Sequence, residues 1–198
     1  MRRIAQAGLA LAMLFSSLSI PLAAFALTPA WYMQNCDWHG RCEAFHLPTA
    51  ERHVHNFSDF LLYKDSLKGF WSDKEKRHLA EVRDIYSVAA AAAIVMMLAV
   101  VVVYVRWPGI LASASMHALI MLVVTAVLVF PVFGFVWRDV FHAALFDNRD
   151  WVTSHTDVTW YITPREFFRN TILGMCVCSA SILASTVFIA RNRVTNSS

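Results

Sequence analysis

Charged residues are absent from four long stretches of the chain, and each of these stretches holds an apolar run. A helix needs about 20 apolar residues to cross the hydrocarbon core of a bilayer, so each run is long enough to span a membrane. Lipid offers the backbone no hydrogen-bond partner, so runs of this length must be helical. The pattern predicts four membrane-spanning helices, over residues 4–27, 85–105, 110–137 and 171–190.

The polar residues gather in two segments between these spans, residues 28–84 and 138–169. Together the two segments contain all 14 acidic residues. We therefore predict an all-α integral membrane protein in which a four-helix bundle carries an extracytoplasmic cap formed by the two outer segments. We expect the whole chain, residues 1–198, to form a single membrane domain.

The first apolar run has two interpretations. "MRR" before it and "AAFA" near its end resemble a secretory signal with a cleavage site at residues 24–26. The apolar stretch is, however, longer than the usual signal core of about 7–15 residues. We expect a retained span, and removal of a signal peptide is the alternative.

Basic residues set the orientation of the spans. The expected inner segments, 1–3, 106–109 and 191–198, carry five arginines and no acid, whereas the outer segments hold 12 basic and 14 acidic residues. Long segments translocate largely regardless of charge, so the basic residues of the short segments determine which segments stay in the cytoplasm. Both termini should therefore be cytoplasmic. No basic cluster indicates nucleic-acid binding.

Two cysteines, Cys36 and Cys42, lie close together in the first outer segment, in "NCDWHGRC". An oxidising compartment and a short spacing favour a structural disulfide between them. A redox-active pair and a metal-binding pair are the alternatives.

Seven of the eight histidines lie in the outer segments. His53 and His55, in "RHVH", are candidates to bind a metal together with His39 or His46. Their spacing is not one of the firm zinc patterns, so we predict no metal site. For His117, inside the third span, we expect a local hydrogen bond.

The segment before the second span, "SDKEKRHLAEVRD", is densely charged and contains one histidine. "SDKE" matches a capping box, in which Ser72 caps a helix and Glu75 returns the hydrogen bond. We expect a helix that begins near Asp73 and continues unbroken into the second span. At 1.5 Å per residue, His78 would lie about 10 Å above Ile85, at the depth of lipid headgroups.

His78 should share one helix face with Glu81, Val82 and Ile85. Glu81 is placed to hold one ring nitrogen of His78 and to leave the other free as a base. His142 follows the third span by five residues, so it too should lie near the membrane surface. The two histidines predict one site facing lipid; a solvated stalk with an incidental histidine is the alternative.

At these residues the sequence resembles the lipoprotein intramolecular transacylases, bacterial four-span membrane enzymes known as Lit. The likeness covers most of the chain from Asn56 onward and rests on four spaced elements besides the spans. The elements are "HNFSDFLLY" with Asn56 and Tyr63, "RHLAEVRDIY" with His78 and Glu81, "FHAALFDNRDW" with Phe141, His142, Phe146, Asn148 and Trp151, and "TDVTWYITPREFF" with Asp157, Pro164, Phe167 and Phe168.

The chain departs from the family pattern at three places. Phe57 stands where the family tends to have Tyr, Lys64 follows the Tyr of the first element, and the region with Cys36 and Cys42 is additional. The resemblance therefore supports residues 31–55 least.

The resemblance implies an acyltransferase without a cofactor. The family moves the sn-2 acyl chain of a diacylglyceryl-modified cysteine to the α-amino group of the same cysteine, which gives an N-acyl lyso-form lipoprotein. This ester aminolysis needs a base for the amine proton and a donor for the oxyanion. Donor and acceptor belong to one molecule, so positioning supplies much of the acceleration. The implied partners are the diacylglyceryl lipoprotein and membrane lipids.

The resemblance also implies site residues and a location. His78 and His142 are the expected catalytic acid and base, in a site on the extracytoplasmic face of the bacterial cytoplasmic membrane. Supporting roles are expected for Glu81, Asn56, Tyr63, Asn148, Trp151 and Asp157, and a lipid pocket is expected from Phe141, Phe146, Phe167 and Phe168.

Two other classes of function fit parts of the sequence. A four-span thiol oxidoreductase would use Cys36 and Cys42, although such proteins usually need a second outer cysteine pair and residues 138–169 contain none. A non-enzymatic membrane protein would bind a metal or haem through the outer histidines.

Overall fold

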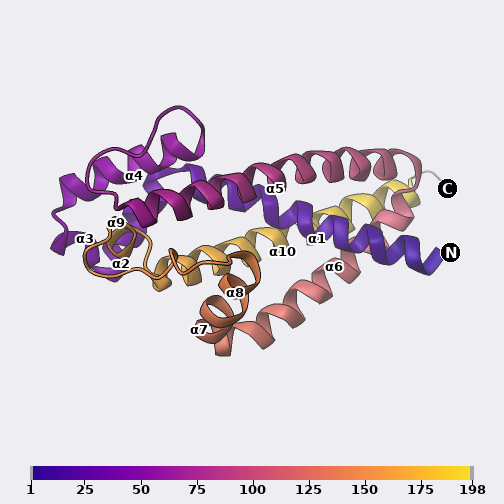
Figure 1. The fold of residues 1–198 in the computed structure, drawn as a ribbon. Helices are drawn as coiled ribbons and strands as arrows, with labels where there is room; N and C mark the ends of the chain where they lie inside the picture. Colours follow the sequence, from indigo (N-terminus) through magenta and orange to yellow (C-terminus); the bar gives the residue numbers. More distant parts are fainter. Residues whose placement is uncertain (1, 197–198) are drawn as a thin grey trace. The chain divides into compact units, whose positions relative to one another are not determined.

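A computed structural model describes residues 2–196. The two terminal segments that were used to orient the spans, residues 1–3 and 191–198, are therefore described only in part. No strand occurs within residues 2–196. The helices, in chain order (Figure 1), are α1 (Arg2–Leu27), α2 (Pro29–His39), α3 (Arg41–Ala44), α4 (Leu47–Leu61), α5 (Asp73–Arg106), α6 (Pro108–Val129), η1 (Phe130–Val132), α7 (Phe133–Phe135), η2 (Val136–Phe141), α8 (His142–Leu145), α9 (Val158–Ile162) and α10 (Arg165–Thr195).

Four helical stretches within the described range are long and apolar enough to cross a membrane, which is the predicted number. They are Gln6–Leu27, Asp73–Arg106, Pro108–Leu145 and Arg165–Thr195. Large apolar side chains on them stay exposed, among them Val95 (67%), Leu128 (68%) and Phe188 (67%). Exposed apolar surface of this extent is expected where lipid is the solvent.

The third span differs from its prediction as one continuous helix. The α-helix ends at Val129, and a 3₁₀ turn, η1, follows before helical structure resumes at Phe133. Pro131 lies in this turn and has no backbone N–H to donate, which explains the interruption.

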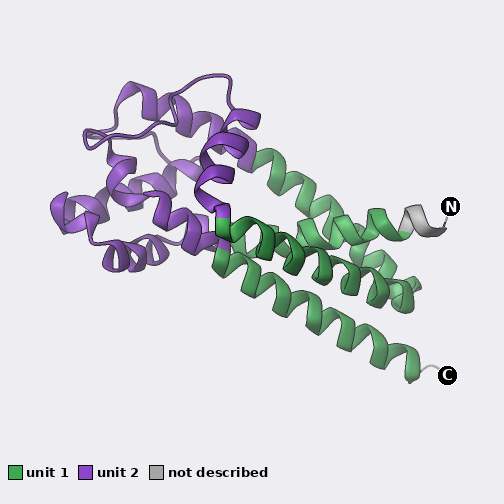
Figure 2. Ribbon diagram, turned by 90° about the horizontal axis from the view of Figure 1, so that it is seen from below, with its two compact units in different colours: residues 1–22, 87–131, 173–198 green, residues 23–86, 132–172 purple. Residues whose placement is uncertain are grey.

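The chain divides into two compact units (Figure 2), Met1–Leu22 with Ser87–Pro131 and Leu173–Ser198, and Ala23–Tyr86 with Val132–Ile172. Unit 1 holds the apolar parts of the long helices, packed around Met13, Leu111, Ala118, Leu122 and Leu183. The Ser179 hydroxyl donates to the Ser17 carbonyl at 2.8 Å inside this unit. Met13 and Ser17, which belong to the apolar run with two interpretations, are both buried in this unit.

Unit 2 holds the shorter helices and the start of α5 and of α10. Its apolar core includes Tyr32, Val54, Phe57, Trp71, Leu79, Val158, Ile162 and Phe167. The predicted capping box is present, because the Ser72 N–H donates to Glu75 at 2.9 Å and the Glu75 N–H to the Ser72 hydroxyl at 3.4 Å. As predicted, α5 begins at Asp73 and runs unbroken to Arg106.

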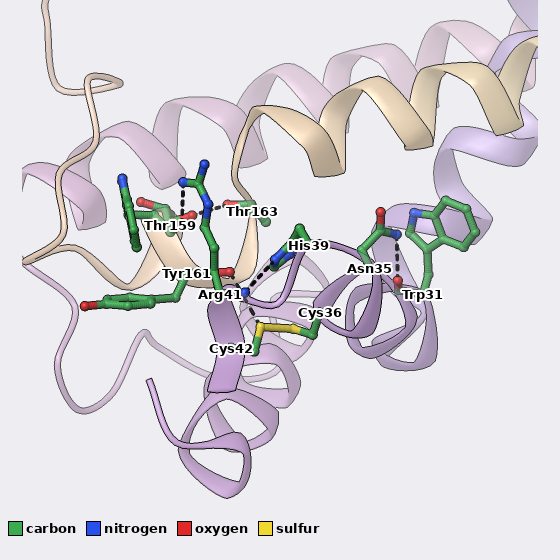
Figure 3. The surroundings of a disulfide bond; sticks show 10 residues. Trp31, Asn35, Cys36, His39, Arg41, Cys42, Thr159, Tyr161 and Thr163 are labelled. Atoms are coloured by element: carbon green, nitrogen blue, oxygen red, sulfur yellow. Dashed lines mark hydrogen bonds between the residues drawn. A yellow bond between two sulfur atoms is a disulfide. The ribbon is translucent and has the colours of Figure 1, made fainter. Parts of the chain in front are cut away.

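Cys36 and Cys42 form the expected disulfide in unit 2. They lie on either side of Gly40, whose φ of +71° lets α2 end and the chain turn directly into α3. Figure 3 shows the bond beside Arg41, whose guanidinium bonds the Trp160 carbonyl and Glu166. The disulfide therefore fixes the turn that carries Arg41 to the α9 region.

Replacing both Cys36 and Cys42 by Ser should lower the free energy of unfolding by about 2–3 kcal/mol, because the short loop gains freedom in the unfolded chain. Denaturant unfolding in detergent micelles measures this change. The acyl transfer that the resemblance implies should remain measurable, and its loss in a folded double mutant would indicate that the pair is redox-active. The double Ser variant of the free thiols Cys176 and Cys178, which form no disulfide, is the matched control.

Candidate active site

A cavity of about 340 Å³ lies within unit 2. Both histidines singled out by the sequence, His78 and His142, line it. Their ring centres are 6.3 Å apart, so one small substrate group can contact both rings. The structure thus brings together two side chains that are 64 residues apart in the sequence.

His142 is positioned by an irregular turn of helix. Residues Val136–Phe141 form a π-helical turn, η2, and the carbonyl of Trp137 accepts the backbone N–H of His142 at its end. The same carbonyl lies 2.6 Å from Nδ1 of His142, which must therefore carry a proton. In the neutral ring, Nε2 of this buried histidine keeps its lone pair, as a general base requires.

His78 lies on α5, with its ring edge-to-face against Phe146 at 4.6 Å. Its Nδ1 is buried without a hydrogen-bond partner, which leaves Nε2 as the nitrogen available to a ligand. Val82 and Ile85, predicted to share its helix face, also line the cavity.

Glu81 is placed differently from the prediction. Its Oε2 lies 3.9 Å from Nδ1 of His78, too far for a hydrogen bond, and it is not among the residues that line the cavity. Its Oε1 accepts instead from Asn148, at 2.9 Å. Because a three-residue spacing on a helix places side chains near each other without fixing their rotamers, the sequence predicted proximity but not this bond.

Aromatic side chains form much of the cavity wall. The four phenylalanines expected to form a lipid pocket, Phe141, Phe146, Phe167 and Phe168, all line it. The ring of Trp151 lies 4.6 Å from that of His142, and its indole N–H donates to the Asn148 carbonyl at 3.0 Å. Most of the wall is apolar, which suits a lipid substrate with one reacting polar group.

On its polar side the cavity is lined by a buried carboxylate, that of Glu75. Glu75 is 2% exposed and accepts four hydrogen bonds, two from the backbone N–H and hydroxyl of Ser72 and two from those of Thr159. Each carboxylate oxygen thus has two donors, so burial leaves no lone pair unsatisfied. This arrangement ties the start of α5 to α9.

Asp157 extends the same network. Its carboxylate contacts Nζ of Lys74 at 2.7 Å and accepts from the Ser154 N–H at 2.7 Å, and its Oδ1 lies 3.2 Å from the Ser72 hydroxyl, whose one proton it shares with Glu75. Burial by itself would raise the pKa of Asp157, but the hydrogen bonds from Lys74 and Ser154 hold this pKa below its ordinary value. Asp157 therefore anchors the 146–158 loop and does not line the cavity.

Asn56 and Tyr63, expected to support the site, do not line the cavity either. The Asn56 side chain bonds the Ser66 carbonyl, the Lys68 N–H and the Trp71 indole, and so fixes the loop after α4. Tyr63 has a φ of +58°, and its hydroxyl lies 3.4 Å from Asp84. Both residues shape the turn that leads the chain into α5.

The candidate histidine metal site does not form. His53 is 4% exposed, with Nδ1 bonded to the Thr49 carbonyl at 2.8 Å and Nε2 accepting from the Phe70 N–H at 3.4 Å, while His55 is exposed. Both nitrogens of His53 are used within the core. His117 makes the local bond predicted for it, to the Ser113 carbonyl at 2.7 Å.

One group of potential metal ligands does occur within the described residues, Cys36, His39 and Cys42, whose ligand atoms lie within 4.8 Å of one another. Both sulfurs are joined in the disulfide, so the group offers no thiolate to an ion. The cysteines are 2% and 0% exposed, which also disfavours the thiol exchange that an oxidoreductase would require.

Three contributors to the cavity were missed by the sequence analysis. Glu75 was interpreted as a cap only, and its bonds to Thr159 join residues 84 apart in the chain. The Trp137 carbonyl reaches His142 only through the π-helical turn. Asp150 lines the cavity and lies inside "FDNRDW", so its acidic side chain beside a site tryptophan was a signal that could have been used.

Comparison with known proteins was made by family and by structure. The family model described as "Lipoprotein intramolecular transacylase Lit" matches residues 7–168. The chain also superposes on the solved membrane-integral Lit of Bacillus cereus with a TM-score of 0.85 and 16% identity, covering 98% of this chain and 96% of that one. No curated protein sequence matches significantly. These matches confirm the predicted all-α membrane fold and the resemblance stated from the sequence.

Proposed function

The chain belongs to the family of lipoprotein intramolecular transacylases, Lit, and from this premise we propose that the cavity of unit 2 is its acyl-transfer site. The enzyme is an acyltransferase of lipoproteins, as predicted, and the family match does not favour the thiol oxidoreductase or the metal-binding protein. The observation that carries the proposal is the pair of imidazoles on the wall of one apolar cavity.

The proposed reaction moves the sn-2 acyl chain of the diacylglyceryl-cysteine to its own α-amino nitrogen. The aromatic wall holds the acyl chain, and the ester carbonyl lies between the two histidines. Because ester and amine belong to one molecule, placing them together removes the entropic cost of a bimolecular encounter.

The geometry supports a distinct role for each ring. His142 takes the amine proton on Nε2 as the C–N bond forms, because its Nδ1 is held by the Trp137 carbonyl. His78 donates a hydrogen bond from its Nε2–H to the carbonyl oxygen as negative charge develops there. His142 then gives the proton on its Nε2 to the glycerol oxygen as the C–O bond breaks, which restores its neutral ring. The site needs no metal or cofactor for this chemistry.

The proposed location is the bacterial cytoplasmic membrane, with the site on the outer face. The chain is a multi-pass membrane protein. The arginine-rich, acid-free inner segments support this orientation, because basic residues in short loops stay in the cytoplasm. A reporter enzyme fused after Ser198, outside the described residues, checks the orientation.

A purified-protein assay tests the function. Incubation with a diacylated lipopeptide bearing a free N-terminal amine should yield an N-acylated, lyso-form product of unchanged mass, because the transfer is intramolecular. Tandem mass spectrometry locates the acyl chain on nitrogen or on glycerol. Persistence of the O-acyl form with folded protein would contradict the proposal.

A further inference from the structure

We propose that Asp150 binds the α-ammonium group of the substrate cysteine and so delivers the amine to the two histidines. This inference rests on the proposed function and adds a recognition residue to it. The α-amino group of a peptide has an ordinary pKa of about 7.7–8, so most of it enters as a cation at neutral pH. A cation entering a largely apolar cavity needs a compensating anion.

Few charged groups line the cavity besides the histidines. They are Glu75, Asp150, Arg138 and Arg165. Both arginines would repel an ammonium ion, and Arg138 is already paired with Asp139 at 3.0 Å. Glu75 already accepts four hydrogen bonds, so it has no lone pair left. Among the described lining residues, Asp150 is therefore the carboxylate with accepting capacity to spare.

Asp150 is held in place from one side. Arg77 donates from Nε to Oδ2 at 2.8 Å and from Nη2 to Oδ1 at 3.3 Å, which leaves each oxygen a second lone pair. The Arg77 side chain is 63% exposed and that of Asp150 is 23% exposed, so the arginine approaches from the solvent side. The Asp150 N–H donates to the Asn148 side chain at 2.9 Å, which fixes the backbone as well.

The surroundings of Asp150 suit delivery of an amine. The charged groups that act on its carboxylate are Arg77, His78 and Lys74, and the hydrogen bond from Arg77 contributes most to holding the pKa of Asp150 below its ordinary value. The carboxylate is therefore ionised at neutral pH. Asp150 lines the same cavity as His78 and His142, and it precedes Trp151, whose ring lies 4.6 Å from that of His142, so an ammonium ion bound here shares the cavity with both imidazoles.

The test measures binding of two diacylated lipopeptides in detergent micelles, identical except that one lacks the α-amino group. The wild type should bind the free-amine form about tenfold more tightly, the size of one hydrogen bond to a charged group. Asp150→Asn should remove most of this preference while binding the des-amino form as the wild type does. Asp150→Glu should restore part of it.

Asp147→Asn is the matched control, since Asp147 is an exposed acid three residues away in the same loop. It should leave the preference unchanged, which excludes a general effect of net charge. Equal binding of the two lipopeptides by the wild type, or an undiminished preference in folded Asp150→Asn, would overturn the inference. Turnover of the free-amine lipopeptide, measured in parallel, tests the proposed function separately.

Discussion

Replacing His78 or His142 by Ala should each lower the rate of acyl transfer by about 10²–10⁴-fold, the usual contribution of a general acid or base. The double variant should be little slower than either single variant, because groups that act in one proton-transfer unit are not additive. The rate is measured with purified protein and diacylated lipopeptide. Full activity in either single variant would remove that histidine from the mechanism.

Controls for this experiment follow from burial. His55→Ala changes an exposed histidine of unit 2, and His117→Ala one that bonds the nearby Ser113 carbonyl, so both should retain most activity. His53→Ala is less suitable as a control, because His53 is buried and bonded at both nitrogens. Glu81→Gln should have a small effect, since Glu81 makes no hydrogen bond to His78.

Replacing Glu75 by Ala should destabilise unit 2 by about 3–5 kcal/mol, the cost of breaking a buried charged network. The change leaves the backbone N–H groups of Ser72 and Thr159 and the Thr159 hydroxyl without their acceptor. Each unsatisfied buried donor costs about 1–3 kcal/mol. The bonds that tie the start of α5 to α9 should then be lost, and acyl transfer should fall with stability.

Asp73→Ala supplies the matched control for Glu75. Asp73 lies two residues away on the same turn of α5, with its side chain 90% exposed. Its replacement should change the unfolding free energy by less than about 1 kcal/mol. Thermal unfolding in micelles, followed by near-ultraviolet circular dichroism, compares the two variants. Equal stability of both would show that the four bonds of Glu75 contribute little.

The site combines an apolar wall with a small polar edge, and this division has a chemical consequence. An ester bound there as proposed would contact mostly apolar side chains, which favours attack by the tethered amine over hydrolysis. The buried bonds of Glu75 and Asp157 keep the polar edge ordered before substrate arrives. Polar groups that are already ordered need no rearrangement as charge develops, so they stabilise the transition state more effectively.

Local features were well determined by sequence. The four spans follow from the length of the uncharged runs, and the capping box of Ser72 and Glu75 follows from residues three apart. The disulfide between Cys36 and Cys42 follows from a short spacing. Each of these features depends on residues close together in the chain or on the surrounding solvent. The sequence alone is therefore enough to predict it.

The tertiary structure alone decided the finer geometry. The bond partner of Glu81 is Asn148 and not His78, the Trp137 carbonyl fixes the His142 ring through a π-helical turn, and Glu75 binds Thr159. These pairings depend on where separate helices and loops of unit 2 pack. Alternative side-chain rotamers differ little in energy, and so do helical turns with and without one extra residue. A local sequence pattern therefore does not distinguish them, and tertiary packing selects one.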